Sequence, residues 1–219
     1  MTTVIDMIRN DYKALQSSER ADVVQDFFNE THLSHFPVLD QEEFMGNLSQ
    51  NDAETFTFDK NINQYKYTFE NFFARAEIGL LDLLEIFARH QTDIVPILDV
   101  NNRYIGYYEV QDIIRVFNET PFLSEKGTTL IVEKDILDYS MSQVVQIVES
   151  NNGKVLGSFI SSDTNSTVQI SIKISSGSIN EIIQTFRRYN YQIISEHYED
   201  YYLADLKDRS DYLKRYLNI

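Results

Sequence analysis

The chain contains one short pattern twice, about sixty residues apart, and this repeat constrains the fold more than any other feature. The run Phe36–Asp40 reads FPVLD, and the run Val95–Asp99 reads VPILD. Each run is followed by a polar turn and then by two apolar residues and a glycine, Gly46 or Gly106. A single unit of this kind cannot bury its sheet face alone. The two copies are therefore predicted to pack on each other in one pseudo-symmetric body.

Each copy predicts the order helix, strand, strand and short helix. Pro37 and Pro96 stand near the start of an apolar run, where a strand tolerates a residue without an N–H group. The polar cluster that follows predicts a turn. The glycine is expected to open the second strand, because backbone or ligand can approach it closely. Asp52 and Asp112 close the two copies and are expected to stand where a helix N-cap stands.

A helix is predicted before each pair of strands. In the second copy the apolar residues follow helical spacing on one face. These residues are Leu80, Leu83, Leu84 and Phe87. The matching residues of the first copy, which are spaced less regularly, are Val23, Val24, Phe27 and Phe28. The segment 53–77 joins the copies and is rich in Tyr and Phe, so it is expected to be packed rather than to form a free linker.

The repeated pattern of Pro-Val-x-Asp, a turn, Gly and then Ser/Thr-x-x-Asp resembles the CBS motif, which is named after cystathionine β-synthase. Two such motifs in tandem form a Bateman module. The resemblance covers roughly residues 1–120, with the first motif in residues 1–60 and the second in residues 61–122. It implies a regulatory protein that binds an adenosine-type ligand (AMP, ADP, ATP or S-adenosylmethionine) and signals by a conformational or oligomeric change.

The resemblance also implies where such a ligand binds. In the family, the Ser/Thr and the Asp hold the ribose hydroxyls, which suits a carboxylate that accepts from two hydroxyls at once. The adenine is expected beside the first strand of the copy and the strand that enters it. The phosphates need a nearby cation, for which His32, His35 and Lys13 are candidates. The implied ligand-binding residues of the first copy are Ser49, Asp52, Gly46, Phe36, Pro37, Val38, Leu15 and His35.

The second copy departs from the pattern, because Glu109 replaces the hydroxyl residue. A carboxylate repels a polyphosphate, so this weaker site is predicted to be degenerate or selective for a less anionic ligand. Its implied residues are Asp112, Glu109, Val95 and Ile97. An alternative stays open for the first copy. Ser49 and Asp52 would then only cap the next helix, and the tandem copies would be an unliganded dimerisation or interaction scaffold for a partner protein.

Residues 126–200 follow the order strand, helix, strand, strand, helix, strand, which is the ferredoxin-like arrangement. Ser140 with Gln143 predicts a capping box at the first of these helices. The expected apolar face of that helix comprises Met141, Val144, Val145 and Val148. The second helix is expected to bury Ile179, Ile182, Ile183 and Phe186. Strict alternation in one strand predicts a buried face made of Val168, Ile170, Ile172 and Ile174.

This topology, placed after tandem CBS motifs, resembles an ACT domain, a module that often binds amino acids between subunits. The whole layout is similar to small regulatory proteins of the acetoin-utilisation type. The turn DILDYS lacks the glycine that ACT ligand sites usually carry, so dimerisation is the plainer role. Residues 201–219 predict a further amphipathic helix, with Leu206, Leu213 and Leu217 on or near one face.

The charge and the composition exclude several functions. A formal net charge of −15 without a run of Lys and Arg argues against binding to nucleic acids or anionic membranes. The absence of cysteine excludes a disulfide framework, a zinc ribbon and a thiol nucleophile. The first residues do not form a secretory signal, and no apolar run approaches the ~20 residues that a membrane span needs. A cytoplasmic location is therefore expected.

The sequence offers no catalytic pattern, since it lacks His-Glu-x-x-His, Gly-x-Ser-x-Gly and a glycine-rich phosphate loop. His32 and His35 lie three residues apart, which suits a metal only in a helix, and Pro37 favours a strand there. We therefore expect an α/β (α+β) protein that is not an enzyme, holds no metal and needs no obligatory cofactor. It is predicted to be a homodimer that takes an adenine nucleotide as a regulatory ligand.

Overall fold

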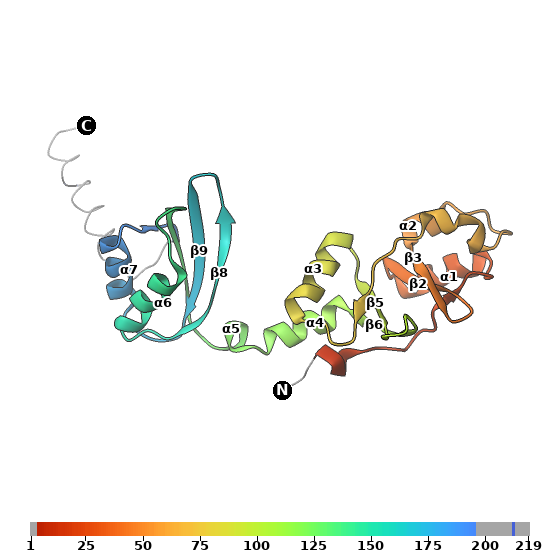
Figure 1. The fold of residues 1–219 in the computed structure, drawn as a ribbon, viewed down its shortest axis with the longest axis horizontal. Coiled ribbons are helices and arrows are strands. Elements are labelled where there is room, and N and C mark those ends of the chain that lie inside the picture. The colour runs from red at the N-terminus through yellow and green to blue at the C-terminus, as the bar shows by residue number, and fades with distance from the viewer. Residues whose placement is uncertain (1–3, 196–211, 213–219) are drawn as a thin grey trace. The chain divides into compact units, whose positions relative to one another are not determined.

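The computed structural model describes residues 4–195 and residue 212. The chain divides into two compact units, Met1–Glu119 and Thr120–Ile219 (Figure 1). Helices and strands alternate in both units, and the predicted α/β class is confirmed. The predicted tail helix lies outside the described residues, apart from Tyr212. In the described part of the chain, no helix combines the length and the apolar character needed to cross a membrane.

The N-terminal unit contains both copies of the repeat, and each copy has the predicted order of elements. The elements around the first copy are η1 (Val4–Met7), β1 (Leu15–Gln16), α1 (Ala21–Thr31), β2 (His35–Asp40), β3 (Glu43–Ser49) and α2 (Gln50–Glu54). The elements leading into and forming the second copy are η2 (Ile62–Thr68), β4 (Ala74–Arg75), α3 (Leu80–His90), β5 (Ile94–Leu98), β6 (Tyr104–Glu109) and α4 (Val110–Asn118).

The two copies form three-stranded sheets with the same topology and register. In the order β1-β2-β3 and β4-β5-β6, the first pair is parallel and the second pair is antiparallel. Gly46 lies opposite Val38, and Gly106 lies opposite Ile97; a register shift follows at the same point in both sheets. The repeat seen in the sequence is thus a repeat in space. The glycine lies inside the second strand rather than at its start, because that strand begins directly after the turn.

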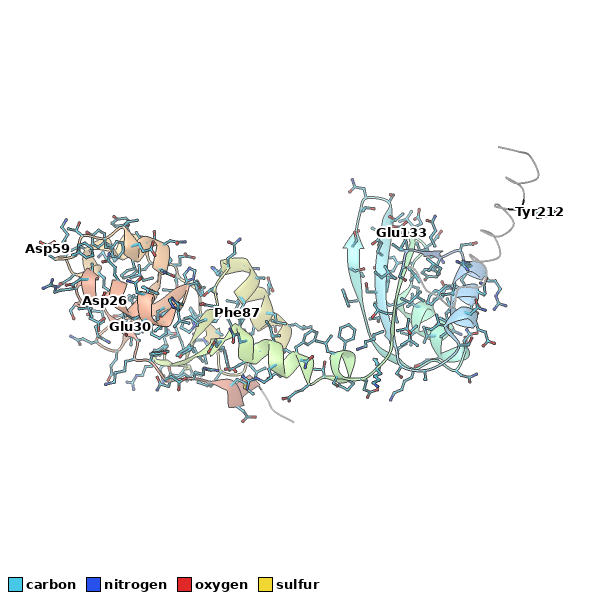
Figure 2. All side chains as sticks on the ribbon, turned by 180° about the vertical axis from the view of Figure 1, so that it is seen from behind. Asp26, Glu30, Asp59, Phe87, Glu133 and Tyr212 are labelled. Atoms are coloured by element: carbon cyan, nitrogen blue, oxygen red, sulfur yellow. The ribbon has the colours of Figure 1, made fainter. Side chains whose placement is uncertain are left out.

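The apolar faces of α1 and α3 cover these sheets. Val24 and Phe28 of α1 are buried as predicted, but Val23 is 54% exposed, because its position is one step off the inward face of the helix. Leu83 is buried on α3, and so is Phe87, which is labelled in Figure 2. The core cluster of the first copy also contains Ile94 and Tyr107 from the second copy, so the two copies share one core there. Its members are Leu15, Ala21, Val24, Phe28, Phe36, Val38, Leu48, Ala53, Phe56, Ile62, Ile94 and Tyr107.

The segment between the copies is packed, as its aromatic content predicts. Phe56, Ile62 and Phe72 are buried, and the ring of Phe56 stacks on that of Tyr65 with centroids 3.9 Å apart. Phe58 and Tyr67 in the same segment are exposed. The segment therefore fixes the second copy against the first instead of tethering it loosely.

Replacement of Gly106 in the second copy is expected to cause a measurable loss of stability. Gly106 has φ +148°, and a Cβ there would lie 2.5 Å from the carbonyl oxygen of Arg9. Because the conformation and the backbone contact both oppose a side chain, Gly106→Ala is expected to lower the free energy of unfolding by about 1–3 kcal/mol. Urea denaturation measures this loss. The control is Gly79→Ala, where φ is −69° and the added Cβ would meet only the side chain of Asp82.

The control substitution is expected to change the stability by less than ~1 kcal/mol, because a flexible carboxylate can move aside. Equal losses for Gly79→Ala and Gly106→Ala would show that the close contact between Gly106 and the backbone of Arg9 does not contribute to the free energy of unfolding.

The C-terminal unit has the predicted ferredoxin-like topology. Its elements are α5 (Pro121–Ser124), β7 (Thr128–Asp135), α6 (Met141–Ser150), β8 (Val155–Asp163), β9 (Thr167–Ile174), α7 (Ile179–Arg188) and β10 (Gln192–Ile193). The four strands form an antiparallel sheet in the order β10-β7-β9-β8. The helices α6 and α7 lie on one face of this sheet (Figure 1).

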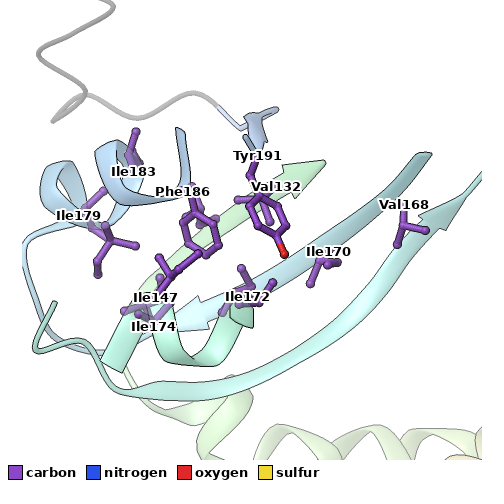
Figure 3. Packing of buried hydrophobic residues seen from close by; sticks show 14 residues of the cluster. Val132, Ile147, Val168, Ile170, Ile172, Ile174, Ile179, Ile183, Phe186 and Tyr191 are labelled. Atoms are coloured by element: carbon purple, nitrogen blue, oxygen red, sulfur yellow. The ribbon is translucent and has the colours of Figure 1, made fainter. Parts of the chain in front are cut away.

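One apolar cluster fills the space between that sheet and its two helices (Figure 3). The predicted inward faces of β9 and α7 are confirmed. On α6, Ile147 is buried together with Val144 and Val148, whereas Met141 and Val145, which were predicted for the same face, are only half-buried. Ser140 caps α6 by accepting from the N–H of Gln143 at 3.4 Å. The Gln143 side chain instead accepts from Nζ of Lys134 at 3.2 Å, so only half of the predicted capping box forms.

Several acidic residues of the N-terminal unit lie on exposed helix faces and turns. Asp26 and Glu30 on α1 and Asp59 in the connecting segment are all exposed (Figure 2). Exposed carboxylates of this kind keep their hydration and need no partner. Asp52 and Glu70 differ from these exposed carboxylates because they line a cavity, which is the candidate site.

Candidate functional site

A cavity of about 410 Å³ lies where the two copies meet inside the N-terminal unit. Its walls come from the start of β2, the last residue of β3, the start of α2, the connecting segment and the end of α3. The lining residues are Ser34, His35, Ser49, Gln50, Asn51, Asp52, Glu70, His90 and Gln91. Three of the predicted ligand-binding residues are therefore brought together, namely His35, Ser49 and Asp52. The cavity is lined by both copies, so an occupant would contact both.

Local chain geometry places Ser49 and Asp52 beside each other. The strand β3 ends at Ser49, which is the N-cap of α2. Its Oγ accepts from the N–H of Asp52 at 3.0 Å and donates to Asp52 Oδ2 at 2.7 Å. The prediction that the closing aspartate is the N-cap was wrong. In both copies the helix starts directly after the strand, so Asp52 and Asp112 are the third helical residues.

Glu70 lies between two histidines on one wall of the cavity. His35 Nε2 is 3.3 Å from Glu70 Oε1, and His90 Nδ1 is 3.7 Å from Glu70 Oε2. The ring of His90 stacks on that of Phe72 with centroids 4.2 Å apart. His35 faces Ser49 across the β2–β3 pair, and its Nδ1 is 3.0 Å from Ser34 Oγ. The wall thus combines one carboxylate with two imidazoles, whose ring nitrogens can each donate or accept a hydrogen bond.

The backbone of the connecting segment delivers Glu70 to this wall. The N–H of Asn47 donates to the carbonyl of Glu70 at 2.8 Å, and the N–H of Glu70 donates to the carbonyl of Asn47 at 2.8 Å. The amide side chain of Asn47 is buried and donates to the carbonyl of Phe72 at 2.7 Å. The sequence interpretation missed both Glu70 and His90. The available signal for Glu70 was a carboxylate that stands between Phe69 and the pair Phe72–Phe73 in the connecting segment.

Ser34 and Asp93 join the two copies next to the cavity. Each residue directly precedes the first strand of its copy. Ser34 Oγ donates to Asp93 Oδ1 at 2.7 Å, and the N–H of Asp93 donates to Ser34 Oγ at 3.1 Å. The N–H of Ser34 also donates to the same carboxylate. These bonds fix the relative position of the two copies at the site.

The apolar residues that the resemblance implied lie in the core instead of among the lining residues of this cavity. Leu15, Phe36, Pro37, Val38 and Gly46 are all buried. The Phe36 ring packs among core aromatic rings. A Cβ on Gly46 would lie 3.0 Å from Cβ of Phe69 in the connecting segment. Contact of these residues with an adenine stays a prediction.

The candidate phosphate cations are also separated by the fold. His32 is exposed and ends α1 in a left-handed conformation, and Lys13 is exposed. Of the three candidates, only His35 lines the cavity. Neither Lys nor Arg is among the lining residues, so the histidines are the groups that could offer positive charge there.

The corresponding position of the second copy holds an ion-pair cluster. Glu109 ends β6 at the position of Ser49, and Asp112 follows at the position of Asp52. Arg9 Nη1 lies 2.8 Å from Glu109 Oε2, and Arg9 Nε lies 2.5 Å from Asp112 Oδ2. Arg115 also pairs with Asp112. The sequence interpretation missed Arg9, which is about a hundred residues away from its partners in the chain.

The other residues predicted for the second site are buried. Val95 and Ile97 are fully inaccessible within the core cluster of the second copy. Burial and, to a smaller extent, the nearby charge of Asp11 together raise the pKa of the Tyr107 phenol to about 12. Tyr107 therefore stays neutral across the physiological pH range. Within the described residues, no group of three or more His, Asp or Glu side chains is placed to hold a metal ion.

Residues 69–119, which span the second copy, match the family model of the CBS domain. The resemblance read from the repeated motif is thus confirmed for that segment. No curated protein matches the chain. The likeness of residues 126–200 to an ACT domain and the likeness of the whole layout to acetoin-utilisation-type proteins stay predictions.

Several solved structures are similar to about half of the chain. A CBS domain pair/ACT domain protein from Thermotoga maritima is 19% identical; the match covers 54% of this chain and 98% of that chain, with a TM-score of 0.49. The CBS domains of a transcriptional regulator from Streptococcus pneumoniae are 18% identical, with coverage of 52% and 98% and a TM-score of 0.46. CBSX2, solved in complex with AMP, is 17% identical, with coverage of 52% and 95% and a TM-score of 0.43.

Proposed function

We propose that this chain is a non-catalytic, regulatory ligand-sensing protein whose first copy binds an adenosine-containing small molecule. The observation that carries the proposal is the meeting of His35, Ser49 and Asp52 in one cavity of about 410 Å³. Small-molecule sites in proteins are concave and mostly ~300–1,000 Å³ in size. The match of residues 69–119 to the CBS domain supports the same reading, because the first copy repeats the strand topology of that segment.

Asp52 is the group proposed to hold the ribose. Its Oδ2 accepts from Ser49, and among the described residues nothing donates to its Oδ1. The side chain is partly exposed toward the cavity. A carboxylate oriented by one hydroxyl can accept from a second hydroxyl on the ligand. Ser49 then has two roles, since it caps α2 and also fixes the carboxylate that receives the ligand.

Signalling follows from where the cavity lies. His35, Ser49 and Asp52 belong to the first copy, whereas His90 ends the second copy's helix α3. A ligand that contacts both copies stabilises the arrangement in which they are close. Binding would shift the population toward that arrangement and so change what the chain presents to a partner or to a second subunit.

The charges of the cavity favour a ligand with few phosphates. Asp52 and Glu70 both line it, and the chain as a whole carries a formal charge of −15. A polyphosphate would meet both the local carboxylates and the overall field. We therefore expect AMP, adenosine or a positively charged adenosine derivative to bind more tightly than ATP.

The test of the proposed function is a thermal-shift titration of the purified chain with AMP, ADP, ATP, S-adenosylmethionine and NAD. A ligand that binds only the folded state raises the Tm as its concentration grows. A concentration-dependent rise with at least one adenosine-containing ligand is the expected result. The absence of a rise with all five would contradict the proposal.

Glu70 provides a sharper prediction about selectivity. Glu70→Gln removes one negative charge from the cavity and keeps the shape of the side chain, which is 43% exposed. The ratio of the ATP Kd to the AMP Kd is expected to fall by roughly three- to tenfold, the effect of a partly screened charge worth ~1 kcal/mol. Isothermal titration at low salt measures both constants. Glu85→Gln, at an exposed position on α3, is the control and should leave the ratio unchanged.

A second candidate function is an interaction scaffold without a ligand. The observation that favours it is the bonding of Ser49 to Asp52, because a serine N-cap of α2 explains the pair without any ligand. In that case the chain would form a homodimer, or hold a partner protein, and its Tm would not respond to nucleotides. Sedimentation analysis of the same samples would then report the assembly state with and without nucleotide.

A further inference from the structure

The second copy holds a cation at the position where the first copy lines its cavity. One guanidinium, that of Arg9, contacts both carboxylates of that position, at 2.8 Å for Glu109 and 2.5 Å for Asp112. Planar guanidinium groups suit such paired contacts, because they offer several N–H donors in fixed directions. Glu109 corresponds to Ser49 by strand register, and Asp112 corresponds to Asp52 as the third residue of the helix that follows.

The backbone holds Arg9 in this place. The N–H of Arg9 donates to the carbonyl of Tyr107 at 2.8 Å, and the N–H of Tyr107 donates to the carbonyl of Arg9 at 2.9 Å. Gly106 leaves the space for this approach, since a Cβ there would be 2.5 Å from the Arg9 carbonyl oxygen. Arg9 is therefore an integral part of the second copy.

The first copy receives its own pairing residue in the same way but with the opposite charge. Glu70 pairs with Asn47 through two backbone hydrogen bonds, as Arg9 pairs with Tyr107. Where the paired residue is Glu70, the strand ends in the neutral Ser49. Where it is arginine, the strand ends in a glutamate. The second copy thus differs from the first at two linked positions: Glu109 stands where the first copy has Ser49, and Arg9 pairs with the strand where the first copy has Glu70.

Burial makes this match necessary. The side chains of Glu109 and Asp112 are 21% and 4% exposed, so each carboxylate has lost much of its hydration. A buried carboxylate needs a positive partner or hydrogen-bond donors. Arg115 supplies a further partner to Asp112, but among the described residues only Arg9 forms an ion pair with Glu109.

We propose that Arg9 is the resident occupant of the second site, so that the chain binds one adenosine-type ligand, in the first copy, rather than two. The number of ligands rests on the proposed function of the first copy, whereas the occupation of the second site by Arg9 does not. Arg9 and Glu109 act together as the specificity determinants: the arginine fills the site, and the glutamate prefers that cation to an anionic ligand.

The first test counts ligands. Isothermal titration with AMP is expected to give one site per chain for the unmodified protein and two for the double variant Arg9→Ala/Glu109→Ser, which removes the cation and restores the hydroxyl. The matched control is Arg89→Ala/Glu85→Ser, which removes an exposed ion pair from α3 and should keep one site. A folded Arg9→Ala/Glu109→Ser protein that still binds one AMP would overturn the inference.

The second test needs no nucleotide. Arg9→Ala alone is expected to lower the Tm, and millimolar methylguanidinium chloride should restore part of that loss by entering the vacated site. NaCl at equal ionic strength is the reference, and neither the unmodified chain nor Arg89→Ala should gain. Failure of methylguanidinium to raise the Tm of Arg9→Ala would count against a resident cation. A variant that only weakened the fold would not respond to this probe.

Two further measurements test the role of Arg9 if Arg9→Ala does not fold or if the unmodified chain does not bind AMP. Should Arg9→Ala not fold, Glu109→Gln weakens the same contact and is expected to speed hydrogen exchange at the amides of Arg9 and Tyr107; unchanged exchange would overturn the inference. Should the unmodified chain bind no AMP, the proposed function of the first copy fails, while the methylguanidinium and exchange measurements still decide the role of Arg9.

Discussion

Asp52→Ala is expected to weaken the binding of the adenosine-type ligand by roughly 30- to 150-fold, the loss of ~2–3 kcal/mol from hydrogen bonds to a charged acceptor. The carboxylate is held by Ser49 at 2.7 Å and lines the cavity, so its removal takes away the acceptor proposed for the ribose hydroxyls. In the thermal-shift titration the variant should lose the ligand-dependent rise in Tm. Isothermal titration of the same variant gives the change in Kd.

Two controls separate ligand binding from a general loss of structure. Asp26→Ala removes an exposed carboxylate of α1 and should bind as the unmodified chain does (Figure 2). Ser49→Ala removes the N-cap of α2 and is expected to cost about 1 kcal/mol of stability, with weaker binding as well. A ligand-dependent rise that survives in Asp52→Ala would place the ligand elsewhere. It would leave Ser49 and Asp52 with the capping role alone.

Phe186→Ala is expected to destabilise the C-terminal unit by about 3–5 kcal/mol, the cost of emptying a buried aromatic position. Phe186 is fully buried between α7 and the sheet, where its ring meets that of Tyr191 with centroids 5.3 Å apart (Figure 3). Hydrogen exchange at the amides of β7 and β9 measures the loss directly, because these strands form the centre of the sheet.

Phe159→Ala is the matched control for this prediction. The same side chain is removed from β8, but there it is 50% exposed, so less apolar surface is lost from the interior. The expected destabilisation is below ~1 kcal/mol. Similar losses for Phe159→Ala and Phe186→Ala would mean that the cluster between the helices and the sheet does not dominate the stability of this unit.

Local periodicity explains why so much of the fold could be predicted. Alternating apolar residues such as Val168 and Ile170 in β9, and the apolar residues of α3 at helical spacing, are set by the geometry of a strand and a helix. The repeat around Pro37 and Pro96 predicts the two strand pairs that the sheets contain. Boundaries were less certain, as the position of Asp52 inside α2 shows.

The sequence by itself determined the repeated units, their strands and helices, the ferredoxin-like order and the pair Ser49 and Asp52. These features depend on neighbours within a few residues, so a one-dimensional pattern records them. Only the tertiary structure decided that Glu70 and His90 line the cavity of the first copy and that Arg9 pairs with Glu109 and Asp112. Such contacts join residues far apart in the chain. Backbone hydrogen bonds of Asn47 with Glu70, and of Tyr107 with Arg9, bring these distant charged residues to their places.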